Sequence, residues 1–160
     1  KFCYVGRPRM STILVNTLTG TTTAGSIAVT GEGNSTTTNL QQGLAKAWVN
    51  FDGTGTIASR DSLNVSGLTD NATGHYTVTV SSAMANNDFA VTTTGFTEIA
   101  AGRVGLFAGL RTNNLSADTP SIYFTTTSIQ MGSGYASSGA SNGALSDSDT
   151  LCADIKGDLA

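Results

Sequence analysis

Apolar and polar residues alternate with a period of two over several short stretches of the chain. In the cleanest run, Tyr76, Val78 and Val80 alternate with polar residues from His75 to Ser81. This period indicates a β-strand with one face turned toward a core. Turn residues such as Asp52-Gly53 separate the stretches. The most distinct expected strands cover residues 11–18, 26–30, 45–51, 62–66, 75–81, 89–94, 103–110 and 121–131.

This spacing of strands predicts the fold class. About seven strands are expected between Ala45 and Met131, with turn signals roughly every ten to fifteen residues. Short strands separated by turns favour an all-β, antiparallel β-sandwich, which we expect to occupy residues 40–131. Residues 132–160 begin with a Gly-, Ser- and Ala-rich stretch. We expect them to form a loop and a C-terminal segment with one helical turn.

Residues 1–39 lack the pattern of a self-contained domain. The stretch from Thr19 to Asn39 is rich in Gly and Thr, with too few apolar groups to offset the entropy of ordering it. We therefore expect an extended N-terminal arm or anchor that becomes ordered on a neighbouring surface. A disordered segment is the alternative. A short helical turn, capped by Asn39 and reaching no further than Lys46, is expected to connect the arm to the sandwich.

The stretch from Ala45 to Phe51 places apolar residues on both faces of the expected strand. Ala45, Ala47, Val49 and Phe51 alternate with positions that include Trp48, the only tryptophan of the chain. Two apolar faces indicate a strand covered on both sides, or one whose tryptophan reaches another subunit. We expect Trp48 to be largely buried, either within the sandwich or between subunits.

Composition removes two classes of function. Charged residues make up only 12% of the chain, about half the usual share. Thr, Ser, Gly and Asn take their place, as in β-structure with many turns. The net charge is −3 and the basic residues form no stripe, so nucleic-acid binding is not expected. No apolar run approaches the roughly eighteen residues of a membrane span, so membrane insertion is not expected.

The cysteines and the histidine carry no motif of a catalytic or metal site. Cys3 and Cys152 lie near opposite ends of the chain and have no metal-ligand spacing. They either close a bridge between the ends or remain free thiols, as in a protein assembled in a reducing cytoplasm. His75, the only histidine, is expected to be an exposed strand residue after a turn. No nucleophile signature frames a serine, so catalytic, metal and cofactor residues are predicted to be none.

The carboxylates are expected to stabilise turns, where Asp accepts hydrogen bonds from backbone amides. These are Asp52, Asp61, Asp70 and Asp88. A glycosidase pair among them, or a calcium site at Asp70 and Asn71, is the alternative. The glycosylation-like triplets at Asn34, Asn64, Asn71 and Asn114 arise easily by chance in a chain this rich in Asn, Ser and Thr.

Three ordered segments between Leu40 and Val91 carry a resemblance to known proteins. They are AKAWVNFDGTGT from Ala45, DSLNVS from Asp61, and DNATGHYTV from Asp70. Together they resemble a module of bacteriophage tail fibre and virion surface proteins, notably of phages of marine bacteria. The resemblance implies a structural, surface-presenting role and threefold fibres. It supplies no ligand.

The leading expectation is therefore a bacteriophage virion structural protein: a tail fibre, head fibre or decoration subunit. It would be displayed on the particle surface after assembly in the cytoplasm of the host bacterium. Its expected partners are further copies of itself (a homotrimer), other virion proteins and host-surface carbohydrate. Binding would come from outward loops, with Tyr135 and the loops around Asn86 and Asn113 as candidates. The alternatives are a self-assembling bacterial filament or adhesin subunit, and a glycan hydrolase.

Overall fold

The computed structural model describes residues 13–21, 27–30, 37–96, 103–110, 124–137 and 144–160. By its internal contacts the chain divides into two compact units, residues 1–40 and residues 41–160. Each unit is described by itself below. Strands make up most of the described residues, and the single helix is one turn long, α1 (Leu40–Gly43). None of the described helical segments is long and apolar enough to cross a membrane.

The described part of the first unit contains one small antiparallel strand pair. Strand β1 (Ala28–Thr30) pairs antiparallel with β2 (Thr37–Asn39), and every residue of both strands is exposed. The expected strand at 26–30 is thus confirmed in part. The strand expected over residues 11–18 is wrong for residues 13–18, which form no strand. Alternation alone cannot make a strand when no second strand pairs with it.

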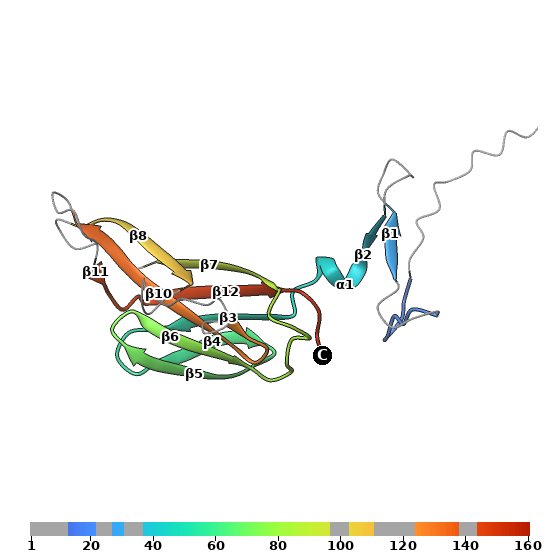
Figure 1. Ribbon diagram of the computed structural model, residues 1–160, viewed down its shortest axis with the longest axis horizontal. Coiled ribbons are helices and arrows are strands. Elements are labelled where there is room, and N and C mark those ends of the chain that lie inside the picture. Colours follow the sequence, from blue (N-terminus) through green and yellow to red (C-terminus); the bar gives the residue numbers. More distant parts are fainter. Residues whose placement is uncertain (1–12, 22–26, 31–36, 97–102, 111–123, 138–143) are drawn as a thin grey trace, which may run out of the picture. The chain divides into compact units, whose positions relative to one another are not determined.

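The second unit is an antiparallel β-sandwich, as predicted. Its first sheet has the order β4-β3-β12-β7. The four strands are β4 (Ala58–Leu63), β3 (Ala47–Asp52), β12 (Thr150–Lys156) and β7 (Ala90–Phe96). The two central strands, β3 and β12, each alternate buried and partly exposed residues. This sheet therefore has one face in the core and one face outward (Figure 1).

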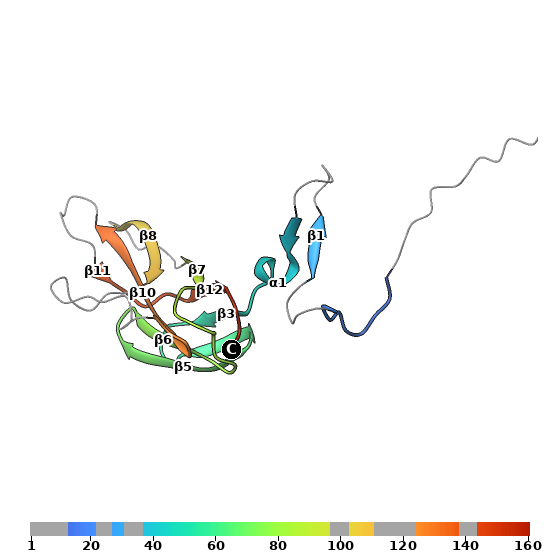
Figure 2. The same ribbon diagram turned by 45° about the vertical axis from the view of Figure 1, so that its right-hand side comes forward.

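The second sheet is built around the long strand β10 (Ser128–Ser137). One side of β10 pairs with β6 (His75–Val80), which in turn pairs with β5 (Val65–Ala72). Also paired with β10 are β8 (Arg103–Leu110), β9 (Phe124–Thr125) and β11 (Ala144–Leu145). The sheets pack on each other, and Figure 2 shows the same arrangement after a 45° turn.

One hydrophobic core fills the space between the sheets. Its largest members include Phe51 and Tyr76, which are 0% exposed and meet edge to face with ring centroids 5.4 Å apart. Both sheets contribute about equally to its membership. The buried apolar residues are Ala47, Val49, Phe51, Tyr76, Val78, Val80, Met84, Ile129, Met131, Leu151, Ala153 and Ile155. All of them belong to residues 41–160, so the core lies entirely within the second unit.

The boundary expected at residue 131 is wrong. β10 continues to Ser137, and β12 lies at the centre of the first sheet rather than in a loop or helical turn. In β12 the apolar residues Leu151, Ala153 and Ile155 alternate with polar ones, and all three are buried. The sandwich therefore needs the C-terminal segment to complete its first sheet.

Two expected strands are each broken by a turn. Asn64 has a φ of 55° and separates β4 from β5, which belong to different sheets, so residues 62–66 do not form one strand. Asn tolerates this left-handed conformation better than other non-glycine residues. Likewise, a turn at Thr126 and Thr127 makes residues 124–131 a hairpin of β9 and β10.

Candidate functional site

The outward face of the first sheet carries a shallow apolar hollow beside Trp48. Trp48 lies on β3, opposite Asp154 of β12 on one side and Leu63 of β4 on the other. Thr92 of β7 lies opposite Asp154. The hollow has a volume of about 390 Å³ and is lined by Ala45, Trp48, Val49, Thr92, Thr94, Cys152, Ala153 and Asp154. This volume is in the range of sites that hold a small ligand or a few side chains.

Trp48 itself is partly exposed on this face. The prediction that it is buried within the sandwich is therefore wrong, and burial between subunits stays a prediction. The reason is the strand period: Ala47, Val49 and Phe51 point into the core, so Trp48 points outward. Replacing Trp48 would thus remove outward apolar surface rather than open a core cavity.

Few charged side chains line the hollow. Asp154 forms an ion pair with Lys156 on the same strand, so this carboxylate carries its own counter-ion. Cys152 is a free, partly exposed thiol, whereas Cys3 lies outside the described residues. Leu63 beside Trp48 is 47% exposed, and Leu44, next to Ala45 in the chain, is 53% exposed. The hollow and Leu63 together form an exposed apolar patch, here called the Trp48 patch.

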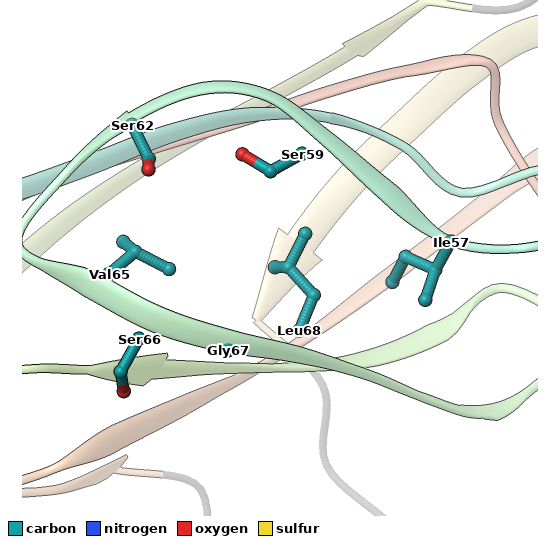
Figure 3. Close-up of a pocket in the computed structure, with 7 residues that line it drawn as sticks. All are labelled: Ile57, Ser59, Ser62, Val65, Ser66, Gly67 and Leu68. Carbon is teal, nitrogen blue, oxygen red and sulfur yellow. The ribbon is translucent and has the colours of Figure 1, made fainter.

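A second, smaller groove separates the edge strands of the two sheets. It has a volume of about 270 Å³ and is lined by Ile57, Ser59, Ser62, Val65, Ser66, Gly67 and Leu68. Figure 3 shows Ser59 and Ser62 of β4 facing Val65 and Leu68 of β5, while Ser66 points away. The apolar members pack against the core, so the groove is a hydroxyl-rimmed seam of the sandwich.

Both strands beside the seam contain β-bulges. In β4 the pairing with β3 shifts between Asn50 and Phe51, and in β5 the pairing with β6 shifts at Ser66 and again near Asn71. Bulges twist an edge strand and disturb the row of free backbone groups. They are one means by which natural sheets discourage pairing with a further strand.

A buried polar network closes one end of the sandwich. The Tyr76 hydroxyl donates to Asp147 Oδ1 at 2.9 Å and lies 3.2 Å from the Gly53 carbonyl oxygen. The Gly74 amide also donates to Asp147 Oδ1, at 2.7 Å. Burial, together with the Asp147 carboxylate, raises the pKa of Tyr76 to about 12. The network joins the loop before β12 to β6 and to the turn after β3, and so stabilises this end of the sandwich.

This network predicts a loss of stability at alkaline pH. An unfolded tyrosine loses its proton near pH 10, whereas folded Tyr76 keeps it until about pH 12. Between these values the unfolded chain binds fewer protons, so the free energy of unfolding falls as pH rises. We expect a loss of roughly 1–2 kcal/mol across this window from Tyr76. Urea denaturation at a series of pH values measures it.

The matched variants for this prediction are Tyr76→Phe and Tyr135→Phe. Tyr76→Phe should cost about 1–2 kcal/mol at neutral pH, through lost hydrogen bonds. It should also reduce the fall of the free energy of unfolding with rising alkaline pH. Tyr135→Phe should leave the alkaline fall of the free energy of unfolding unchanged. Equal slopes for the native chain and for Tyr76→Phe would show that other groups cause the alkaline loss.

Of the residues singled out in the sequence, His75 differs most from expectation. It is 8% exposed, and its Nε2 lies 3.0 Å from Gln130 Oε1 of β10. The expectation of an exposed strand residue is wrong. His75 lies between two paired strands, opposite Gly132 of β10 and Ala72 of β5, and its ring contacts the Gln130 side chain. His75 thus belongs to the packing of the second sheet.

One of the four carboxylates, Asp52, holds a turn as expected. Asp52 Oδ1 accepts from the Thr54 amide at 2.9 Å and the Thr54 hydroxyl at 2.6 Å, and Asp52 also pairs with Arg60. The Thr54 hydrogen bonds are the main cause that lowers the pKa of Asp52. Asp61 accepts from the Ser62 amide but lies within β4, so the expectation of a turn is wrong there. At Asp88 the roles are reversed, because its amide donates to Asn86 Oδ1.

The remaining candidates are scattered over the sandwich. Asp70 lies exposed in β5, and the neighbouring Asn71 donates to Thr77 Oγ1 at 2.9 Å. Tyr135 lies partly exposed in β10, opposite Ala144 of β11. Asn86 is exposed in a turn, whereas Asn113 lies outside the described residues. Among the described residues, no cluster of three or more His, Cys, Asp and Glu side chains could hold a metal ion.

The sequence pattern offered an outward Trp48 as one of two alternatives, but it did not point to the hollow beside it. The signal for an outward Trp48 was present, because an apolar residue at the polar phase of a strand indicates an outward apolar face. Comparison of the chain with models of protein families, with curated proteins and with solved structures finds no match.

Proposed function

We propose that this protein is a structural subunit of a bacteriophage virion, displayed on the particle surface as a tail fibre, head fibre or decoration protein. The observation that carries the proposal is the division of the chain. Residues 41–160 contain the whole core, whereas no described residue of the first unit is buried. Such an organisation suits a stable outward domain with an N-terminal segment that binds something else.

The three segments that resemble virion surface modules support the same proposal. They fall on β3, β4, β5 and β6, two neighbouring strands from each sheet. The function they support is presentation of a rigid domain, assembled in the host cytoplasm and exposed on the finished particle. The free thiol of Cys152 agrees with assembly in a reducing compartment.

The proposed partners are further copies of the chain, other virion proteins and host-surface carbohydrate. A homotrimer is the proposed assembly, on the resemblance to threefold fibres. For carbohydrate, the exposed turn at Asn86 offers amide groups on a rigid sandwich. We propose no catalytic role, since the two carboxylates Asp52 and Asp61 bond to neighbouring turn and backbone groups.

A bacterial filament or adhesin subunit is the second candidate. It is favoured by residues 13–18, whose large apolar side chains are exposed and which could be donated as a strand to a neighbour. The bulges in β4 and β5 count against it, because they disturb two of the edges to which a strand would add. Electron microscopy of the purified assembly separates a closed oligomer from an open fibre.

Deleting residues 1–39 tests whether the second unit folds by itself and whether the first unit is needed for assembly. We expect the shortened chain to keep a cooperative, β-rich fold, because the whole core remains. We also expect it to lose self-association and incorporation into particles. Circular dichroism, thermal unfolding and sedimentation velocity measure these properties against the full chain. A shortened chain that still oligomerises, or that fails to fold as a monomer, would contradict the proposal.

A further inference from the structure

The first unit exposes a run of large apolar side chains. Ile13, Leu14, Val15 and Leu18 are between 55% and 89% exposed. No described residue of this unit is buried, so the described part of the unit offers these side chains no core. Exposed aliphatic groups gain free energy when a second surface removes them from water. The run from Ile13 to Leu18 is here called the apolar arm segment. Docking on a second apolar surface would therefore stabilise it.

The Trp48 patch is the described surface that best matches this segment. It joins a hollow of about 390 Å³ to the exposed side chain of Leu63. The apolar arm segment carries no charged residue, and the one carboxylate in the hollow, Asp154, is paired with Lys156. Neither surface would bury an unpaired charge on contact. The seam between β4 and β5 is smaller, and serine hydroxyls line part of it.

The two units also carry opposite charges. Residues 1–40 contain three basic residues and one acidic residue, a net charge of +2. Residues 41–160 contain five basic and ten acidic residues, a net charge of −5. Since Lys1, Arg7 and Arg9 come just before the apolar arm segment, long-range attraction would bring this segment toward the sandwich of another copy. Sandwiches alone would repel one another.

We propose that the apolar arm segment of one copy docks on the Trp48 patch of a second copy. This inference rests on the proposed function, because it names the contact through which the subunit assembles. The described segment bends at Asn16. Docked as an extended strand, it would place Ile13 and Val15 on one face and Leu14 and Leu18 on the other, so that one pair enters the hollow. Each copy gives one arm and receives one. A closed ring of copies therefore satisfies every arm and every patch.

The test uses two full-length variants that damage opposite halves of the contact. The arm variant carries Ile13→Ser, Leu14→Ser, Val15→Ser and Leu18→Ser. The patch variant carries Thr94→Arg, which fills the hollow from an exposed position on β7 and repels the basic arm. By sedimentation velocity, each variant alone should associate at least about a hundredfold more weakly than the native chain.

Mixing the two variants gives the decisive measurement. The patch variant keeps an intact arm, and the arm variant keeps an intact patch, so one contact per pair remains. We expect a one-to-one heterodimer, and raised salt should weaken it because the two units carry opposite charges. The fluorescence of Trp48, the only tryptophan, should shift to shorter wavelength on mixing.

The matched control is Ser66→Arg on β5, at the seam rather than the patch. It should associate like the native chain. The proposal is overturned if Thr94→Arg associates normally, if Ser66→Arg alone blocks association, or if the mixture stays monomeric. A saccharide that binds the native chain and is lost in Thr94→Arg, with association unchanged, would assign the patch to carbohydrate instead. Display on virions is judged separately, by detecting the native chain on purified particles.

Discussion

Removing residues 149–160 is expected to abolish folding of the sandwich. This segment contains β12, which lies between β3 and β7 and pairs with both. Without it the first sheet separates into a β3–β4 hairpin and the single strand β7. The core also loses Leu151, Ala153 and Ile155, each no more than 3% exposed. A domain of this size is stable by only about 5–15 kcal/mol, less than such a loss.

Circular dichroism and thermal unfolding of a chain ending at Ser148 measure this effect. Two point variants keep the prediction testable if the shortened chain cannot be isolated. Leu151→Ala, at a position with no exposure, should cost about 2–5 kcal/mol, whereas Leu159→Ala, 44% exposed, should cost about 0.5 kcal/mol or less. A cooperative transition in the shortened chain, or equal costs for the two leucines, would contradict the central role of β12.

The alternation of apolar and polar residues was sufficient to predict the sandwich class and several strands. Tyr76, Val78 and Val80 in β6 were expected on one buried face, and the structure confirms this. The same holds for Ala47, Val49 and Phe51 in β3. In these runs one face is apolar throughout, so local pattern and tertiary burial agree.

The C-terminal strand shows why composition can mislead. Leu151, Ala153 and Ile155 alternate with polar residues, which is the period of a strand. The preceding Gly- and Ser-rich stretch is typical of a linker. The short alternation that follows it was therefore expected to belong to a loop and a C-terminal segment. What makes the segment a strand is its position between β3 and β7, residues distant in sequence. The converse applies at residues 13–18, where alternation exists without a partner strand.

The candidate sites depended on contacts that no local pattern contains. Tyr76 and Asp147 are 71 positions apart, yet the hydroxyl of one donates to the carboxylate of the other. The Trp48 patch likewise brings together β3, β4, β7 and β12. An outward Trp48 was foreseeable from the strand phase of β3. The hollow beside it was not, because its walls come from three strands that only the sheet order places side by side.

Gly74→Ala is expected to be among the most damaging single substitutions in the described chain. Gly74 has a φ of 62° in the turn between β5 and β6, a conformation that disfavours a side chain. A Cβ there would lie 2.3 Å from the Ser133 carbonyl oxygen and 2.8 Å from the Ser146 amide nitrogen. Both are backbone atoms and cannot rotate away. The Gly74 amide also donates to Asp147, so a shift would disturb the Tyr76 network.

Gly55→Ala is the matched control, because it separates backbone strain from collision. Gly55 has a φ of 59°, nearly that of Gly74, but a Cβ there meets nothing within 4 Å. Gly55→Ala should therefore cost only about 1 kcal/mol, the strain of the left-handed conformation. Gly74→Ala should cost about 3 kcal/mol or more, because collision adds to that strain. Urea denaturation of both variants gives the difference. Equal losses would mean that the Ser133 and Ser146 backbone yields to the added methyl group, and that the end of the sandwich is less tightly packed than the distances indicate.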